Sequence, residues 1–328
     1  MGDESTDELA PAQRRARFKL PRWASMLVAV AFLAGAFYVI RSELAHNSPQ
    51  EMFAALRSIP VSIVLATLGL TALSFACLIV CEWIALSMLG HGDIPLRRVW
   101  RPAFTAYALG NAMGLTYATV PAARARLYKD DLTAVEIAKL SALTGAAVLI
   151  GGAGIAGLGI LFAAEEIAGR TFGTVHLWWL AGLGLLAPMI AWLATAAGVR
   201  PAQRLFGLRL PRRRFAVAQV LVGMLDWACA AAVLYLLLPT HAGWSYPAFV
   251  AVFLAAGVVG AVSGAPAGIG VFEATILALS ANTQYAPAMA AGLIAYRLIW
   301  TVAPLTVGAL MMGYDMLRGK RRAASRNP

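Results

Sequence analysis

Residues 61–88 read VSIVLATLGLTALSFACLIVCEWIALSM, a stretch in which Glu82 is the only charged residue. A helix of about 20 mostly apolar residues crosses the ~30 Å hydrocarbon core of a bilayer. This stretch is therefore long enough to span a membrane, and it decides the class of the protein. Comparable stretches follow it along the chain, so we expect an all-α polytopic membrane protein.

The composition of the chain agrees with this class. Of the 328 residues, 60% are hydrophobic and 13% are charged, whereas about 25% of a soluble domain is charged. The apolar stretches leave no room for a separate catalytic domain, so we expect no enzyme activity of that kind. The net charge of +11 comes from basic residues beside apolar stretches, a pattern typical of membrane topology. No nucleic-acid partner is expected.

The apolar stretches predict about six full spans, which are Trp23–Ile40, Val61–Met88, Val135–Ala163, His176–Ala197, Phe215–Leu238 and Pro287–Tyr314. A short amphipathic stretch, Pro49–Ser58, lies between the first two. In this interpretation residues 23–314 form one transmembrane domain, with halves at about 61–163 and 176–314. Basic tails at residues 1–22 and 315–328 flank this domain.

Basic residues beside the spans predict the orientation, since lysine and arginine accumulate on the cytoplasmic side of a membrane. The segment 199–214 holds six arginines and no acid, and the C-terminal tail is basic as well. Both segments should be cytoplasmic. The basic end of the N-terminal tail should also stay inside, so we expect a multi-pass protein of the cell inner membrane with both termini in the cytoplasm.

Two apolar stretches, residues 102–120 and 247–281, are interrupted by glycine and proline. A full crossing by the first would invert all later loops and place the arginine-rich segment outside. We therefore expect a re-entrant hairpin that turns near Leu109–Gly114, and a second broken hairpin that enters from the opposite face. Three full crossings between residues 247 and 314 would satisfy the orientation equally well. The residues expected at the breaks are Gly110, Gly114, Pro266, Gly268 and Gly270.

Each half then consists of a span, a hairpin and a further span, arranged in opposite senses. The dipeptide Glu82-Trp83 in the first half resembles Asp226-Trp227 in the second. Inverted repeats with paired discontinuous helices are typical of transporters whose site lies near the middle of the bilayer. The sequence therefore predicts an inverted repeat around a cavity that the hairpins line.

Four charged residues lie at membrane depth, where a charge is costly and usually lines a cavity or pairs with another charge. They are Glu82, Asp226, Glu273 and Arg297. One interpretation is a buried polar pathway. The alternative is an internal ion pair that fixes helix packing, for instance between Arg297 and either Glu273 or Asp226.

Two segments are candidates for binding a lipid head group. Glycines precede a helix in Gly268–Glu273, and the N–H groups at such a helix start suit a phosphate or carboxylate. Glu273 either caps this helix or recognises a cationic head. A second group, at the mouth of the first hairpin, is expected to gather an anionic head group because arginine binds phosphate bidentately. Its members at the mouth are Arg124, Arg126 and Tyr128, and Asn111, near the turn of the same hairpin, is a further candidate for binding the head group. The alternative is two arginines that only anchor a cytoplasmic loop.

Other apparent motifs are rejected. Gly152–Gly157 matches G-x-G-x-x-G, but it lies inside a span without a preceding strand, so we expect small residues for close helix packing. Cys77 and Cys81 share a helical face with no histidine beside them, so we expect ordinary packing and no metal site. The four histidines lack the spacing of a metalloprotease, and no cofactor is expected.

Several of these segments resemble the membrane domain shared by lysylphosphatidylglycerol synthases, also called multiple peptide resistance factors, and by stand-alone flippase-like proteins. The resemblance covers about Ser58–Tyr314. It is carried by Ala106–Asn111, Arg124–Tyr128, Gly268–Glu273, and Tyr296-Arg297-Leu298 with Pro304 and Gly308. The chain departs from the family pattern at Pro121-Ala122-Ala123, where a glycine pair is common, and at Pro266-Ala267-Gly268, where Pro-Gly-Gly is common. The backbone is therefore less free to approach a ligand at these two places.

The resemblance implies a lipid flippase without the soluble transferase domain of the bifunctional members. We expect the protein to bind and translocate an anionic phospholipid or a lipid-linked intermediate. A homodimer and a separate lipid-modifying synthase are candidate protein partners. The alternatives are an accessory subunit or membrane enzyme in lipid or lipid-linked glycan modification, a transporter of a small solute, and a scaffold that recruits a synthase.

Overall fold

A computed structural model of the chain describes residues 49–113, 116–171, 173–196, 213–263, 266–280 and 286–324. These residues are almost entirely helical and include no strand, which confirms the predicted all-α class. The span expected at Trp23–Ile40 and the N-terminal tail lie outside the described residues.

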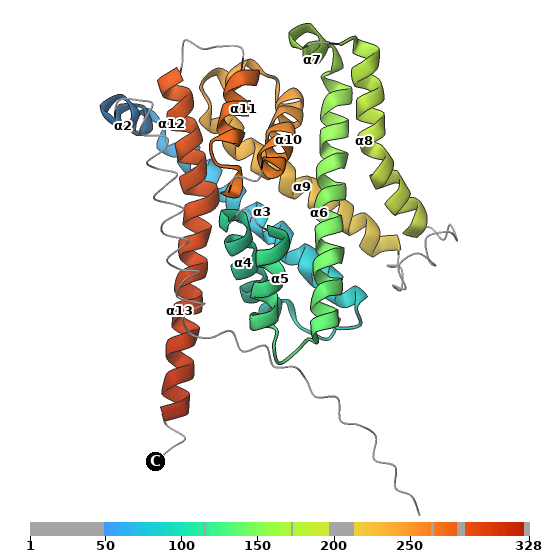
Figure 1. The fold of residues 1–328 in the computed structure, drawn as a ribbon, viewed down its shortest axis with the longest axis vertical. Coiled ribbons are helices and arrows are strands. Elements are labelled where there is room, and N and C mark those ends of the chain that lie inside the picture. Colours follow the sequence, from blue (N-terminus) through green and yellow to red (C-terminus); the bar gives the residue numbers. More distant parts are fainter. Residues whose placement is uncertain are drawn as a thin grey trace, which may run out of the picture.

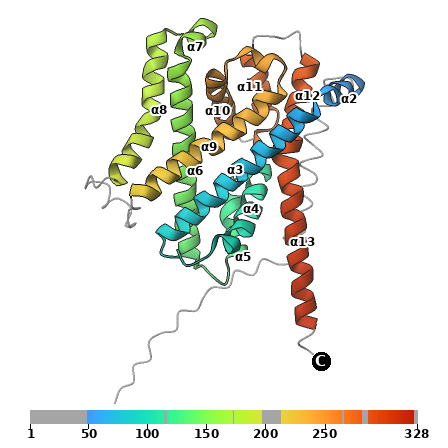
Figure 2. The same cartoon turned by 180° about the vertical axis from the view of Figure 1, so that it is seen from behind.

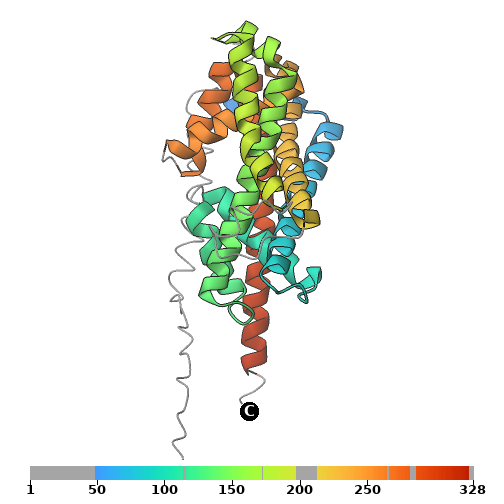
Figure 3. The same cartoon turned by 90° about the vertical axis from the view of Figure 1, so that its right-hand side faces the viewer.

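Five helical stretches in the described part are long and apolar enough to cross a membrane, so the protein is polytopic. The first four are α3 (Val61–Met88), α6 (Ala134–Phe162), α8 (Val175–Ala196) and α9 (Arg213–Leu237). The fifth is one continuous helix built from α12 (Ala286–Tyr296), the π-helical segment η5 (Arg297–Val302) and α13 (Ala303–Ala324). All five predicted spans that fall in the described part are therefore present. The last helix continues past its predicted end at Tyr314, and Figure 3 shows it leaving the bundle toward the C-terminus.

Helices α3 and α9 run antiparallel through the middle of the bundle, as Figures 1 and 2 show from opposite sides. Helix α6 packs on both α8 and α9. A Cβ atom on Gly151 would lie 2.4 Å from the carbonyl carbon of Gly223 in α9. A Cβ atom on Gly157 would lie 2.8 Å from the carbonyl oxygen of Gly182 in α8. The glycines of α6 thus let the helices approach closely, as their position within a span predicted.

The first hairpin consists of α4 (Leu96–Met113) and α5 (Thr116–Leu127). Helix α4 ends at Met113 and α5 begins at Thr116, so Gly110, which was expected at the break, lies inside α4, and Gly114 lies outside the described residues. The 12 residues of α5 rise about 18 Å, which is too short to cross a bilayer. The N-terminus of α4 and the C-terminus of α5 form the open end of the hairpin. Both lie at the end of the molecule toward which α13 runs, as Figure 1 shows.

The second hairpin consists of α10 (Tyr246–Val262), the short turn of helix η3 (Pro266–Gly268) and α11 (Val271–Leu279). The nine residues of α11 rise about 14 Å, so this segment does not contain the full crossings that were the alternative. The hairpin opens at the opposite end of the molecule from the first, and its η3 segment contacts α4 (Figure 1). The tips of the two hairpins therefore meet inside the bundle.

Each half thus contains a long helix, a hairpin and a further long helix. The first series is α3, α4–α5 and α6, and the second is α9, α10–α11 and α12–α13. The antiparallel course of α3 and α9 and the opposite openings of the hairpins agree with the expected inverted repeat (Figure 1). The short helices α2 (Pro49–Ser58), α7 (Ala164–Arg170) and η2 (Pro239–Gly243) complete the described structure.

Candidate functional site

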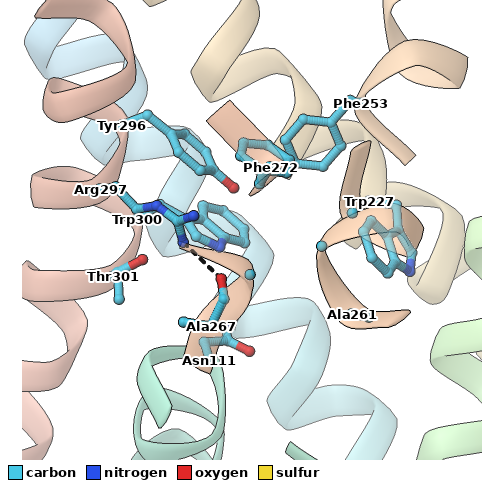
Figure 4. A pocket seen from close by; sticks show the side chains of 13 residues that line it. Asn111, Trp227, Phe253, Ala261, Ala267, Phe272, Tyr296, Arg297, Trp300 and Thr301 are labelled. Carbon is cyan, nitrogen blue, oxygen red and sulfur yellow. Dashed lines mark hydrogen bonds between the residues drawn. The ribbon is translucent and has the colours of Figure 1, made fainter. Parts of the chain in front are cut away.

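A cavity of about 210 Å³ lies where the two hairpin tips meet (Figure 4). Its walls are mostly aromatic and small apolar residues, with three polar side chains among them: Asn111, Arg297 and Thr301. The full lining consists of Asn111 from α4, Trp227 from α9, Phe253, Gly257, Gly260 and Ala261 from α10, Ala267 and Gly268 from η3, Phe272 from α11, Tyr296 from α12, and Arg297, Trp300 and Thr301 from η5.

The break of the second hairpin forms one wall of this cavity. Ala267, Gly268 and Gly270 all have positive φ angles, of 54°, 63° and 80°. A Cβ atom on Gly268 would lie 3.1 Å from the Cα atom of Gly260, so this position needs glycine for space as well as for conformation. Ala267 holds the same left-handed conformation with a side chain, which costs roughly 1–2 kcal/mol. This is one of the two places where the chain departs from the pattern of the family that it resembles.

Arg297 enters the cavity from η5 (Figure 4). It pairs with Glu273 of α11. Its Nε donates to Glu273 Oε1 at 2.6 Å, and its Nη1 donates to the carbonyl oxygen of Ala267 at 3.4 Å. Its Nη2 also lies 2.6 Å from Glu273 Oε1, yet makes no hydrogen bond of good geometry within the described part of the chain. The guanidinium stands over the ring of Phe272, 5.4 Å from its centroid.

Glu273 has a second partner besides Arg297. Its Oε2 accepts a hydrogen bond from the N–H of Gly270 at 2.8 Å, so Glu273 caps the start of its own helix. The other carboxylate oxygen pairs with Arg297. Of the ion pairs considered from the sequence, the one between Glu273 and Arg297 forms, and no pair between Asp226 and Arg297 is found among the described residues.

A second ion pair lies away from the cavity, between α3 and α5. Arg124 and Glu82 are both fully buried, with side chains 1% and 0% exposed. Arg124 binds the carboxylate with two nitrogens: Nε donates to Oε1 at 3.1 Å and Nη2 donates to Oε2. The guanidinium also donates to Ser141, Thr144 and Tyr107, at 2.9, 3.0 and 3.0 Å.

The four residues expected to bind a head group do not lie together. Arg124 and Tyr128 are buried, Arg126 is exposed, and Asn111 lines the cavity at the hairpin tip. The expected place of Arg124 at the cytoplasmic mouth is therefore corrected, because its donors are used inside the protein. Helical spacing contained a signal for this: Arg124 and Tyr128 are four residues apart on one face, whereas Arg126 lies on the opposite face.

Asp226 is the remaining buried carboxylate, 7% exposed on α9. The Ser74 hydroxyl of α3 donates a hydrogen bond to its Oδ1, so this contact crosses the central pair of antiparallel helices. The following residue, Trp227, points the other way: its Nε1 donates to the carbonyl oxygen of Val148 at 2.8 Å, and its ring lines the cavity.

Sequence reasoning missed most of the cavity wall. Trp300 and Thr301 were not singled out, although Trp300 follows Tyr296 by four residues and therefore shares its helical face. The two rings stack with centroids 6.1 Å apart. Tyr107 and Ser74, which bind the buried charges, were also missed because hydroxyl residues are common in helices and carry little signal alone.

Comparison with known proteins finds two related chains. The chain is 27% identical over 311 residues to the uncharacterized protein slr0712 of Synechocystis sp., covering 92% of this chain and 95% of that protein. It is 25% identical over 266 residues to the inner membrane protein YbhN of Escherichia coli, covering 80% and 82% of the two chains. No family model matches the chain. Together with the apolar helices, these similarities support a multi-pass membrane protein.

Proposed function

We propose that the protein binds an anionic phospholipid or lipid-linked intermediate and moves it across the cell inner membrane. The observation that carries this proposal is the cavity between two hairpins that enter from opposite ends, with Arg297 in its wall. Paired discontinuous helices that meet at a site near the middle of the bilayer are typical of transporters. The inner membrane is proposed from the name of the relative YbhN.

The size of the cavity favours a small polar group over a whole lipid. Its volume of about 210 Å³ is below the roughly 300–1,000 Å³ of pockets that enclose drug-sized ligands. A head group would occupy the cavity while its chains stay in the bilayer. The exposed apolar side chains of Val258 and Val262, on α10 beside the cavity residues Gly257 and Ala261, offer a surface that such chains can follow.

The polar lining is suited to an anion. Arg297 brings a positive charge to the cavity wall, and Asn111 and Thr301 add an amide and a hydroxyl donor. A phosphate group in the cavity would be attracted by this charge and could accept hydrogen bonds from these donors. Glu273 already balances the charge of Arg297, so binding stays weak enough for release.

The second ion pair has a different role in this proposal. Arg124 and Glu82 fasten the first hairpin to α3 and keep its tip, with Asn111, at the cavity. Arg126, which is exposed near the open end of the same hairpin, is the arginine placed to attract lipid head groups at the surface.

Exchange of fluorescent anionic lipids between the leaflets of proteoliposomes tests the proposal. Wild type should exceed empty liposomes, and Thr301→Val should slow the exchange because it removes a cavity hydroxyl. Thr306→Val is the matched control, since Thr306 is exposed on the following helix and its hydroxyl donates only to its own helix. Exchange no faster than in empty liposomes for any anionic lipid would contradict translocation and favour an accessory or enzymatic role in lipid modification.

A further inference from the structure

Three buried carboxylates occupy the core of the described structure, and only two of them have a cationic partner. Glu82 pairs with Arg124, and Glu273 pairs with Arg297. Asp226 receives one hydrogen bond, from Ser74, and makes no ion pair within the described residues.

The ionisable groups that interact with Asp226 are neutral in their ordinary state. They are Cys77 and Cys81 on α3, Cys229 on α9 itself, and Tyr296 on α12. Glu82 follows Cys81 on α3, but Arg124 balances its charge. Helices α6, α8 and α10 also pack on α9, and none of their described residues forms an ion pair with Asp226.

A carboxylate in these surroundings is stabilised by taking up a proton. Transfer of an isolated charge from water into an apolar interior is so costly that the group neutralises instead. The hydroxyl of Ser74 satisfies one oxygen of either form. We propose that Asp226 is a proton-binding site, at which the carboxylate takes a proton from water to give a neutral carboxylic acid and later releases it to water.

The position of Asp226 indicates what its proton would do. Asp226 lies at the contact between α3 and α9, which are the corresponding first helices of the two halves. Any movement of one half against the other would change this contact. Its neighbours Trp227 and Tyr296 line the cavity. Proton uptake at Asp226 thus couples the cavity to a proton gradient. This coupling rests on the proposed lipid translocation. Proton binding at Asp226 does not depend on it.

Infrared titration of the protein in nanodiscs tests proton binding. The wild-type spectrum should contain the absorption band of a protonated carboxylic acid at neutral pH, and Asp226→Asn should lose that band. Asp226→Glu, which keeps the acid, should retain it and thereby distinguish a lost acid from a lost fold. The double variant Glu82→Gln/Arg124→Met and the single variant Glu273→Gln are controls that should leave the band in place, because Glu82 and Glu273 are paired with arginine and both variants keep Asp226. A band unchanged in Asp226→Asn would overturn the proposal.

Lipid exchange under an imposed pH gradient tests the coupling. The gradient should change the rate or direction of exchange in wild type, and Asp226→Asn should lose this dependence completely. Wild-type exchange that ignores the gradient would overturn the coupling while leaving lipid translocation intact. If wild type exchanges no lipid at all, the proposed function fails, and the infrared titration alone decides whether Asp226 binds a proton.

Discussion

Arg124 and Glu82 are 42 positions apart in the chain, and the structure joins them as a two-point ion pair buried between α5 and α3. Among the described residues, the guanidinium also donates hydrogen bonds to Ser141, Thr144 and Tyr107. A buried pair of this kind holds the first hairpin firmly against the long helix α3.

Loss of either partner of this pair should destabilise the protein strongly. Arg124→Met leaves Glu82 as an uncompensated buried charge, which costs about 3–5 kcal/mol. Thermal unfolding in detergent should show a clear fall in Tm. The double variant Glu82→Gln/Arg124→Met removes both charges and should recover much of the loss. A single variant as stable as wild type would contradict the fastening role and restore Arg124 as a candidate ligand for a head group.

Removal of the cavity arginine should weaken lipid binding more than removal of an exposed arginine does. A hydrogen bond to a charged group contributes about 1.5–3 kcal/mol, so Arg297→Gln should weaken the binding of an anionic lipid roughly 10- to 150-fold. Binding to detergent-solubilised protein can be followed by the fluorescence of Trp300 and Trp227 in the cavity wall. Arg57→Gln is the matched control, because Arg57 is exposed on α2 and has no role in the proposed binding. Equal effects of the two substitutions would argue against the cavity as the site.

The hairpin break at Ala267 should accept glycine with a gain in stability. Ala267 has a φ of 54°, and a residue without Cβ avoids most of the cost of this conformation. Ala267→Gly should therefore raise the stability by about 1 kcal/mol. Ala261→Gly, in the regular helix α10, should lower it by a similar amount. A lower Tm for Ala267→Gly than for Ala261→Gly would contradict the cost assigned to the conformation of Ala267.

The predicted orientation can be tested with single cysteines after replacement of Cys77, Cys81 and Cys229, which are buried. A cysteine at Lys129 should react with an impermeant thiol reagent only from the cytoplasm. A cysteine at Thr174 should react only from outside, because Thr174 directly precedes α8 and the start of α8 lies with α7 at the opposite end of the molecule (Figure 1). The reverse pattern would invert the topology, and reaction of both cysteines from one side would contradict the arrangement of the spans.

The fold was largely predictable because span length and chain breaks are local properties. The length of Val61–Met88 identified a crossing, and Gly268 and Gly270 marked a break that the structure shows with positive φ angles. The pair of Glu273 and Arg297 was among the alternatives because few charges lie at that depth.

The candidate site was less predictable, since it depends on contacts between distant segments. Positive-inside loops contain arginine throughout, so composition did not separate the buried Arg124 from the exposed Arg126. The partner of Arg124 lies in another helix, and only helical spacing hinted that the two arginines face opposite ways. Asn111 reaches the cavity because the two tips meet, which no local pattern of residues encodes.

Photocrosslinking tests the central claim most directly. A photoreactive anionic phospholipid, added to the protein in nanodiscs, should label peptides that contain Trp300 and Thr301, and an excess of the same lipid without the photoreactive group should suppress the labelling. Arg297→Gln should lose this label while keeping any label on the outer faces of the helices. Labelling confined to those outer faces in wild type, with none in the cavity wall, would contradict the account.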